Sequence, residues 1–344
     1  MKIPQASNLV SESQRLGVTD ITIKYSSPSV NGRDVWNSSV IPKNGDPIAW
    51  RAGANMNTTI EFSTDVAING QPLKAGKYGF HVIPGDNTHT LIFAHANNLW
   101  GSYYLNMEED ISLRVEVASR PCQFSEKLDY EFLNWEEDAV EIALEWADKQ
   151  IPFKVSVDLN TTVINSFRAE LRGENTNRWQ AWNDAASWCI NRNINLEEAL
   201  EWANRSINGG YGGFAANKNL TNVSTKFYAL SKLNIKEQLS AMIEEIAALD
   251  YSDGDAFYLS KSLIDSKNYA LALDLLKLAH QKYPDQWYLY TNDAVSNYFL
   301  GNHEKAVELM KKTLDLSPPQ QHIARINEVI SEMESGTYQI PVRS

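Results

Sequence analysis

The residues of this chain best suited to bind a ligand stand together in one short segment, Trp-Arg-Ala-Gly-Ala-Asn at 50–55. Arg51 offers a planar cation that can hold a carboxylate or phosphate through two parallel hydrogen bonds. Trp50 offers a ring for stacking, and Gly53 lets a ligand approach the backbone closely. The same residue types also suit an internal role, in which Arg51 bonds loop carbonyl groups and Asn55 closes a turn. Trp50, Arg51 and Asn55 are therefore candidate ligand-binding residues, and the internal role is the favoured alternative.

Three nearby histidines, His81, His89 and His95, raise the question of a metal site. Zinc ligands converge to about 2 Å from one ion, whereas residues six apart on one strand lie about 20 Å from each other. With a symmetric four-residue turn at 84–87, Val82 faces His89, and His81 points to the other side of the sheet. We therefore expect no metal and no cofactor, and keep His81 only as a candidate ligand-binding residue.

An aromatic group follows at 97–104, where Trp100, Tyr103 and Tyr104 stand beside two asparagines. Rings next to amide groups suit the binding of sugars or peptides. The alternative, which the sequence leaves open, is that these rings fill a corner of the core. Trp100 and Tyr103 complete the set of candidate ligand-binding residues, and we expect Tyr104 to be the more exposed of the tyrosines.

The motifs of common catalytic sites are missing from the sequence. No Gly-x-Ser-x-Gly string occurs, and neither Cys122 nor Cys189 stands near a histidine. The acidic runs at 108–110 and 136–138 lack the alternation of a calcium loop, and the glycine-rich run at 209–213 lacks the lysine of a phosphate loop. We therefore name no catalytic residue. Two free thiols are favoured over a disulfide, which the sequence leaves open.

The bulk composition describes a protein with enough apolar material for packed cores. The chain has 344 residues, which favours two domains, and 43% of them are hydrophobic. The net charge of −12 argues against nucleic acid or an anionic membrane surface as a partner. No apolar run approaches the roughly 20 residues that span a bilayer, so no membrane insertion is expected. The first residues lack the apolar core of a signal peptide and look like a mature start behind an initiator Met.

Residues 1–160 carry the pattern of a β domain. Ile21, Ile23 and Tyr25 alternate along a strand at 19–26, and Asn-Gly at 69–70 predicts a tight hairpin turn. Residues 1–18 show no period and are expected to form an extended arm. Further strands are predicted at 58–64, 66–69, 76–83, 88–96, 111–118, 124–135, 139–146 and 151–159. Short strands with close turns predict an antiparallel sandwich or flattened barrel.

Residues 163–335 change to the helical period of 3.6. The segments 268–276 and 302–310 match at a spacing of 34 residues, with Ala272 and Ala306 at the same place in both. This is the tetratricopeptide period, in which small residues let two helices approach closely. We expect about four helical hairpins closed by a helix at 319–334. The tail at 336–344 is expected to be either loose or pinned to another surface.

The β half resembles the family named domain of unknown function 2911. The resemblance rests on short strings at 19–22, 25–33, 50–55, 75–78, 83–85 and 100–103, and it covers most of residues 7–158. Domains of this family are common in secreted or periplasmic proteins of the Bacteroidetes, often with repeats behind them. The resemblance thus implies a periplasmic or secreted location, and it implies no activity, cofactor or catalytic residue.

These observations favour a non-catalytic binding or protein-interaction protein of the bacterial cell envelope. Stacked hairpins present a concave groove, which would bind a peptide or a partner protein. The alternative is a receptor for a small carbohydrate or anionic ligand, or a hydrolase, with its site on the sandwich around Arg51, Asn55, His81 and Trp100. Either reading rests on a β domain at 1–160, helical repeats at 163–335 and a tail at 336–344.

Overall fold

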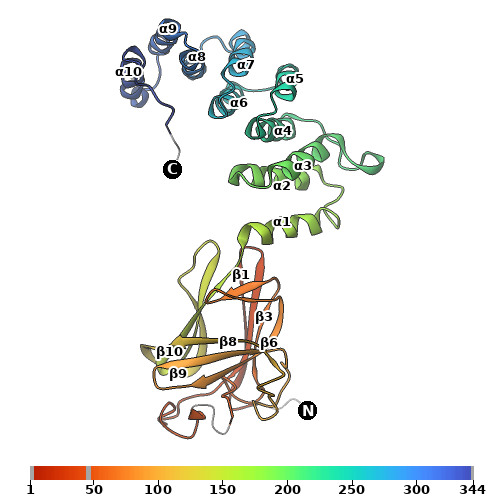
Figure 1. Ribbon diagram of the computed structural model, residues 1–344, viewed down its shortest axis with the longest axis vertical. Coiled ribbons are helices and arrows are strands. Elements are labelled where there is room, and N and C mark those ends of the chain that lie inside the picture. The colour runs from red at the N-terminus through yellow and green to blue at the C-terminus, as the bar shows by residue number, and fades with distance from the viewer. Residues whose placement is uncertain (1–3, 44–47, 342–344) are drawn as a thin grey trace. The chain divides into compact units, whose positions relative to one another are not determined.

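The computed structural model describes residues 4–43 and 48–341. The chain divides into two compact units, residues 1–166 and 167–344, with strands in the first and helices in the second (Figure 1). Within the described residues, no helix is both long and apolar enough to cross a membrane. The expectations for the first three residues and for the end of the tail, 342–344, fall outside the described part.

Two antiparallel sheets form the β unit. Their strands run in the orders β1-β2-β3-β6-β7-β8 and β5-β4-β10-β9, and the described strands form a sandwich without closing into a barrel. The inward-facing rings fill the space between the sheets; Phe80 stacks on Phe153 and meets Phe93 edge-on. The predicted antiparallel sandwich is confirmed. The strands are β1 (Asn8–Leu16), β2 (Thr19–Ser27), β3 (Thr58–Phe62), β4 (Val66–Ile68), β5 (Gln71–Leu73), β6 (Gly76–Pro84), β7 (Thr88–Ala94), β8 (Ile111–Ala118), β9 (Arg120–Leu133) and β10 (Ala139–Ser156).

The turn residues predicted the β4–β5 hairpin correctly, whereas the predicted turn between β6 and β7 was wrong. Asn69 and Gly70 both have positive φ and join β4 to β5 in a two-residue turn, as expected. The turn after β6 lies one residue later than predicted, because Pro84 still belongs to the strand and pairs with His89. The observed register thus differs by two residues from the one that placed Val82 opposite His89. An even shift preserves the faces, so His81 and His89 do point to opposite sides of the sheet.

Two strand predictions were wrong for physical reasons. Residues 8–16 form β1 instead of a free arm; they pair with β2 along its whole length, but most of their side chains are exposed at the sheet edge, so no apolar alternation marks them. β10 is one long strand where two were predicted. Its pairing with β9 is interrupted around Ala147, which has a φ of 55°, and this bulge carries the strand past the polar residues that looked like a turn.

The helical unit repeats one motif, a pair of antiparallel helices. The hairpins α2–α3, α4–α5, α6–α7 and α8–α9 are followed by α10, which confirms the predicted four hairpins and closing helix. In Figure 1, α4, α6 and α8 lie on one side of this unit and α5, α7 and α9 on the other. The helices are α1 (Leu159–Glu170), α2 (Trp179–Arg192), α3 (Leu196–Asn208), α4 (Leu220–Leu233), α5 (Lys236–Ala247), α6 (Asp253–Asp265), α7 (Tyr269–Lys282), α8 (Trp287–Phe299), α9 (His303–Asp315) and α10 (Gln320–Glu334).

Local signals explain where the hairpins turn. A residue with positive φ follows the first helix of each pair, namely Asn193, Asn234, Lys267 and Gly301. Ala272 and Ala306, the small residues of the 34-residue period, are fully buried at the helix contacts. The two cysteines are free, as favoured from the sequence, and burial raises the pKa of the Cys189 thiol.

One partly buried polar contact links the edge strand β1 to the other sheet. The Tyr25 hydroxyl lies 2.7 Å from Glu12 Oε1 and also contacts the carboxylate of Asp129. A phenol has one proton to donate, so both contacts are satisfied only when a carboxyl group also holds a proton. Burial raises the pKa of Glu12, and the nearby acidic residues Asp129 and Glu131 act in the same direction.

This contact predicts a pH-dependent contribution to stability. Because the pKa of Glu12 is higher in the folded chain, its contribution is fully present below the ordinary value of 4.5 and is lost as the pH rises through the folded-state pKa. We expect Glu12→Gln to raise the free energy of unfolding at pH 7 by about 0.5 kcal/mol after solvent screening. Urea unfolding at pH 4.5 and pH 7 measures this, with the exposed Glu116→Gln as control. A loss of stability at pH 7 in Glu12→Gln alone would contradict it.

Candidate functional site

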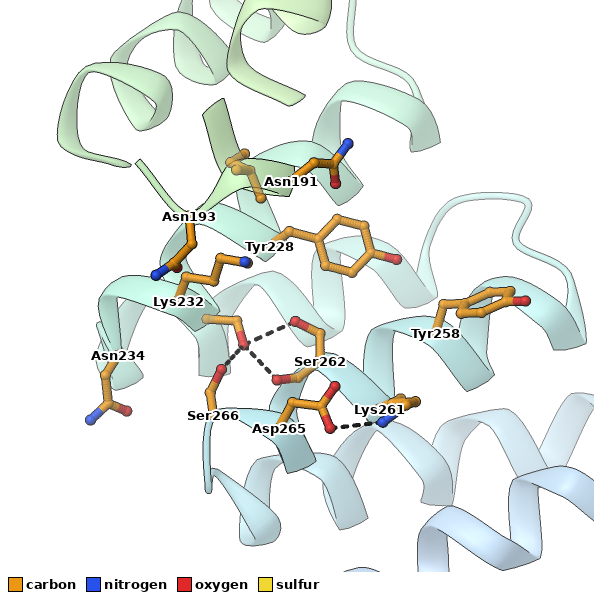
Figure 2. Close-up of a pocket in the computed structure, with 12 residues that line it drawn as sticks. Asn191, Asn193, Tyr228, Lys232, Asn234, Tyr258, Lys261, Ser262, Asp265 and Ser266 are labelled. Carbon is orange, nitrogen blue, oxygen red and sulfur yellow. Dashed lines mark hydrogen bonds and ion pairs between the residues drawn. The ribbon is translucent and has the colours of Figure 1, made fainter. Parts of the chain in front are cut away.

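One hollow of the helical unit runs along the first helices of three successive hairpins. This inner groove has a volume of about 620 Å³ (Figure 2). Its walls come from α2, α4 and α6 and from the turns that follow them. The lining residues are Ile190, Asn191, Asn193, Tyr228, Ser231, Lys232, Asn234, Tyr258, Lys261, Ser262, Asp265 and Ser266.

Helical spacing places these side chains on one side. Tyr228 and Lys232 are four residues apart on α4, as are Lys261 and Asp265 on α6, and residues at this spacing lie above one another. The Ser231 hydroxyl joins the two helices, since it lies 3.0 Å from the Ser262 carbonyl oxygen and 2.9 Å from the Ser266 hydroxyl. The floor of the inner groove is therefore held by direct hydrogen bonds between hairpins.

The inner groove combines amides, rings and a small positive charge. Lys261 pairs with Asp265 at 2.7 Å, whereas Lys232 has no ion pair within the described part of the chain. One cation is thus left over in a protein whose net charge is −12. Burial raises the pKa of Tyr228 to about 12, so its hydroxyl stays a neutral hydrogen-bonding group. Tyr258 is 61% exposed, and its ring meets only the Phe257 ring among the aromatic contacts of the described residues.

Such a lining suits an extended peptide. Asparagine amides both donate and accept hydrogen bonds, as the main chain of a peptide does. An exposed tyrosine ring packs against apolar side chains, and a free ammonium group pairs with a carboxylate. The repeat period predicted a groove, but the residues that line it come from three hairpins and carry no contiguous motif. Only the spacing of Tyr228, Lys232, Lys261 and Asp265 on the exposed helix sides could have indicated them.

The β unit has a hollow of its own, of about 610 Å³, and it brings together four of the six residues predicted from the sequence. Trp50, Arg51, Asn55 and Tyr103 line this β cavity, whereas His81 and Trp100 do not. Trp50 is buried, however. Its ring stacks at 6.0 Å on Trp146, and its main chain exchanges two hydrogen bonds with Val82.

Arg51 is held by its own loop. Its guanidinium donates a hydrogen bond to the Asn55 carbonyl group and lies 5.3 Å from the centre of the Tyr103 ring. Gly101 packs directly on the guanidinium with a φ of 68°, and a Cβ at this position would collide with it. Asn55 has a φ of 60°, and its side-chain amide reaches the Ser7 carbonyl oxygen. These contacts give Arg51 and Asn55 the internal partners that the alternative interpretation requires.

A serine–histidine pair lies behind this loop, and it was not predicted from the sequence. His81 Nδ1 is 2.7 Å from Ser102 Oγ, and both side chains are buried. Burial, together with the nearby charge of Arg51, lowers the pKa of His81 to about 4, so the imidazole is neutral at pH 7. A buried pair offers no surface to a substrate, and its geometry fits a role in fastening the 100–103 segment to β6. The only sequence signal was the position of Ser102 inside a family-specific string.

The aromatic residues beside this pair face outward. Trp100, Tyr103 and Tyr104 are 58%, 60% and 78% exposed, so Tyr104 is the more exposed tyrosine, as predicted. These rings therefore do not fill a corner of the core. Trp100 is separate from the β cavity, and only Tyr103 both lines it and contacts Arg51.

The contacts of Arg51 predict that it stabilises the β unit. We expect Arg51→Ala to lower the free energy of unfolding by about 1–3 kcal/mol, because a carbonyl group loses its charged donor. Urea unfolding measures the change. The matched control is Arg15→Ala, which removes an exposed ion pair with Asp20 and should change the stability less than Arg51→Ala does. Equal stabilities of the two variants would show that the internal partners of Arg51 contribute nothing.

Comparison with solved structures finds tetratricopeptide proteins. A tetratricopeptide repeat protein from Parabacteroides merdae ATCC 43184 has 14% identity and a TM-score of 0.38, over 52% of this chain and 68% of that one. MamA from Desulfovibrio magneticus RS-1 has 19% identity and a TM-score of 0.31, over 48% and 94%. YrrB, described as a tetratricopeptide protein with an unusual peptide-binding site, has 17% identity and a TM-score of 0.28, over 48% and 99%. At these scores the assignment of helical repeats rests on the hairpins of this chain.

No curated protein matches the chain significantly. Residues 7–155 match a sequence family described as "Protein of unknown function (DUF2911)". The resemblance carried by the strings between 19 and 103 is thereby confirmed. Residues 7–155 are thus similar to the DUF2911 family, and helical repeats follow that segment.

Proposed function

We propose that the helical unit is a protein-interaction domain whose inner groove binds an extended segment of a partner protein. The observation that carries the proposal is the position of the groove, which follows the same side of α2, α4 and α6 over about 620 Å³. Its volume lies within the roughly 300–1,000 Å³ range of ligand sites. Repeat domains of stacked hairpins use such surfaces to hold extended partners.

The lining supports a peptide with alternating polar and apolar contacts. Asn191, Asn193 and Asn234 supply amides at successive points along the groove. These groups can replace the water that hydrates a peptide main chain, so that binding leaves few hydrogen bonds unmade. Tyr258 supplies an aromatic anchor of the kind that dominates the binding energy of many interfaces. Lys232 favours a carboxylate on the partner.

This proposal predicts that one exposed tyrosine is needed for binding and another is not. Peptides are selected on the full chain from a displayed random library, and their affinities are measured by fluorescence anisotropy. We expect Tyr258→Ala to weaken the selected peptides at least 10-fold, which is about 1.4 kcal/mol. The matched control is Tyr211→Ala, which removes a ring that is 95% exposed but lies outside the groove.

Two outcomes would contradict the proposal. The first is a failure to select any peptide from the library. The second is an equal effect of Tyr258→Ala and Tyr211→Ala on the peptides that are selected. Because both rings are exposed, neither substitution is expected to change the free energy of unfolding by more than about 0.5 kcal/mol, so a loss of binding reports on contacts.

A second candidate function rests on the β cavity, which has two guanidinium groups, Arg33 and Arg51, in its wall. This lining supports a small anionic or carbohydrate ligand, bound by a receptor or turned over by a hydrolase. Thermal shifts of the full chain in a panel of acidic sugars test it. Ligands that stabilise the unsubstituted chain and not Arg51→Ala support this function, and shifts that persist in the variant contradict it.

We also propose that the protein works in the periplasm or outside the cell. The family resemblance of the β half supports this location. Fractionation of the cells that make the protein tests it, and recovery in the cytosolic fraction alone would contradict it.

A further inference from the structure

A second hollow continues the inner groove toward the last helices. This apolar pocket has a volume of about 360 Å³ and lies between α6, α8 and α10. Lys261 lines both hollows, so the two adjoin at this side chain. The walls of the apolar pocket include Phe257, Trp287, Val295 and Ile326, in contrast to the amides of the inner groove. One extended partner could therefore pass from polar to apolar surroundings.

The chain's own tail forms one wall of the apolar pocket, through Tyr338, Ile340 and Pro341. Gly336, with a φ of 73°, turns the chain back after α10, and the main-chain N–H groups of Thr337 and Tyr338 donate to the Glu332 carbonyl oxygen. Tyr338 is only 8% exposed, and its ring meets Tyr298 at 5.6 Å and Phe299 at 6.0 Å. Of the two expectations for the tail, the pinned one holds for residues 336–341.

The tail makes its contacts as an extended peptide would. Tyr338 and Ile340 stand two residues apart and both line the pocket, whereas Thr337 before them and Gln339 between them are exposed. This is the alternation of an extended strand. After Tyr338, no residue of the described tail makes a main-chain hydrogen bond to the helices. Beyond the bonds of Thr337 and Tyr338 to Glu332, side-chain packing holds this segment, which leaves it easy to exchange for another.

We propose that the apolar pocket is a binding site for an extended peptide with an aromatic residue and, two positions later, an aliphatic residue. The chain's own residues 336–341 occupy this site until such a partner displaces them. The proposal rests on the proposed function, because it names the partner's chemistry at the end of the same groove. A partner that fills both hollows would bind through its polar part first and then compete with Tyr338 and Ile340.

Competition within one chain has a measurable consequence. A tethered segment acts at an effective concentration in the millimolar range, so a free peptide binds with an affinity reduced by the fraction of time that the site is open. Removing the two anchoring side chains should therefore strengthen the binding of an external peptide. The gain measures how well the tail closes the site.

The test uses a dye-labelled hexapeptide with the tail's own sequence, Gly-Thr-Tyr-Gln-Ile-Pro. Its affinity is measured by anisotropy for the full chain and for the full-length double variant Tyr338→Ser/Ile340→Ser. We expect the double variant to bind the hexapeptide at least 10-fold more tightly. The control variant Thr337→Ser/Gln339→Ser changes only exposed positions and should match the unsubstituted chain. A hexapeptide with serine in place of its tyrosine and isoleucine should bind none of these proteins.

Equal affinity of the hexapeptide for the full chain and the double variant would overturn the proposal, as would tight binding of the serine-substituted hexapeptide. If the double variant does not fold, the unsubstituted chain is titrated with millimolar hexapeptide while the NMR signals of Tyr338 and Ile340 are followed. Displacement moves these signals to the positions of a free chain. Unchanged signals would overturn the proposal.

The outcome is separable from the test of the inner groove. Tyr258 does not line the apolar pocket, so Tyr258→Ala should leave the affinity of the hexapeptide for the double variant unchanged. A failure of tail competition with intact library peptides would reject only the tail site. A failure of the library peptides with intact tail competition would reject only the inner groove.

Discussion

A hairpin of two short helices has more apolar surface than its two members can bury against each other, so each hairpin needs a neighbour. In the helical unit this need is met at contacts such as those of Ala272 and Ala306, which are fully buried. Stacking then aligns every first helix on one side. The inner groove is a consequence of this alignment, since no single hairpin contains it.

The stacking of hairpins also separates the residues that form the core beneath the groove from those that are free to contact a partner. The apolar sides of α4 and α6 are committed to the core, and the Ser231–Ser262 bond ties the two helices at the floor. Tyr258 and Lys232 project from the opposite sides, where stacking makes no demand on them. The Tyr258 ring is largely exposed, and Lys232 has no ion pair among residues 4–43 and 48–341, which supports assigning both side chains to a partner.

In the β unit, by contrast, residues of types that often bind ligands make contacts within the fold instead. Trp50 looked like a stacking platform, but its ring already stacks on Trp146 within the core. Arg51 looked like an anion ligand, but its loop carbonyl group and the backbone at Gly101 enclose it. The segment 50–55 therefore fastens a loop to the sheet. The β cavity beside it is what remains available to a ligand.

The sequence predicted what depends on local chemistry and on repetition. The hairpin turn at Asn69, the alternating strand β2 and the 34-residue helical period all follow from residue type and spacing. It missed β1, because an edge strand with exposed side chains shows no apolar alternation, and it split β10 at a bulge that only the partner strand makes visible.

The residues of the candidate sites were harder to predict from the sequence, for a physical reason. The residues of the inner groove come from three hairpins, and His81 and Ser102 come from segments 21 residues apart. Such neighbours are set by packing and register, which no single stretch of sequence records. Residue types at 50–55 and 97–104 did point to the β cavity and its rim, although Trp100 and His81 lie outside it.

The central claim is that partners bind along the first helices of the hairpins. A crystal structure of the full chain with a library-selected peptide tests this most directly. The account predicts an extended peptide on α4 and α6, with contacts to Tyr258 and Lys232. A peptide bound instead on α5 and α7, or in the β cavity, would contradict it.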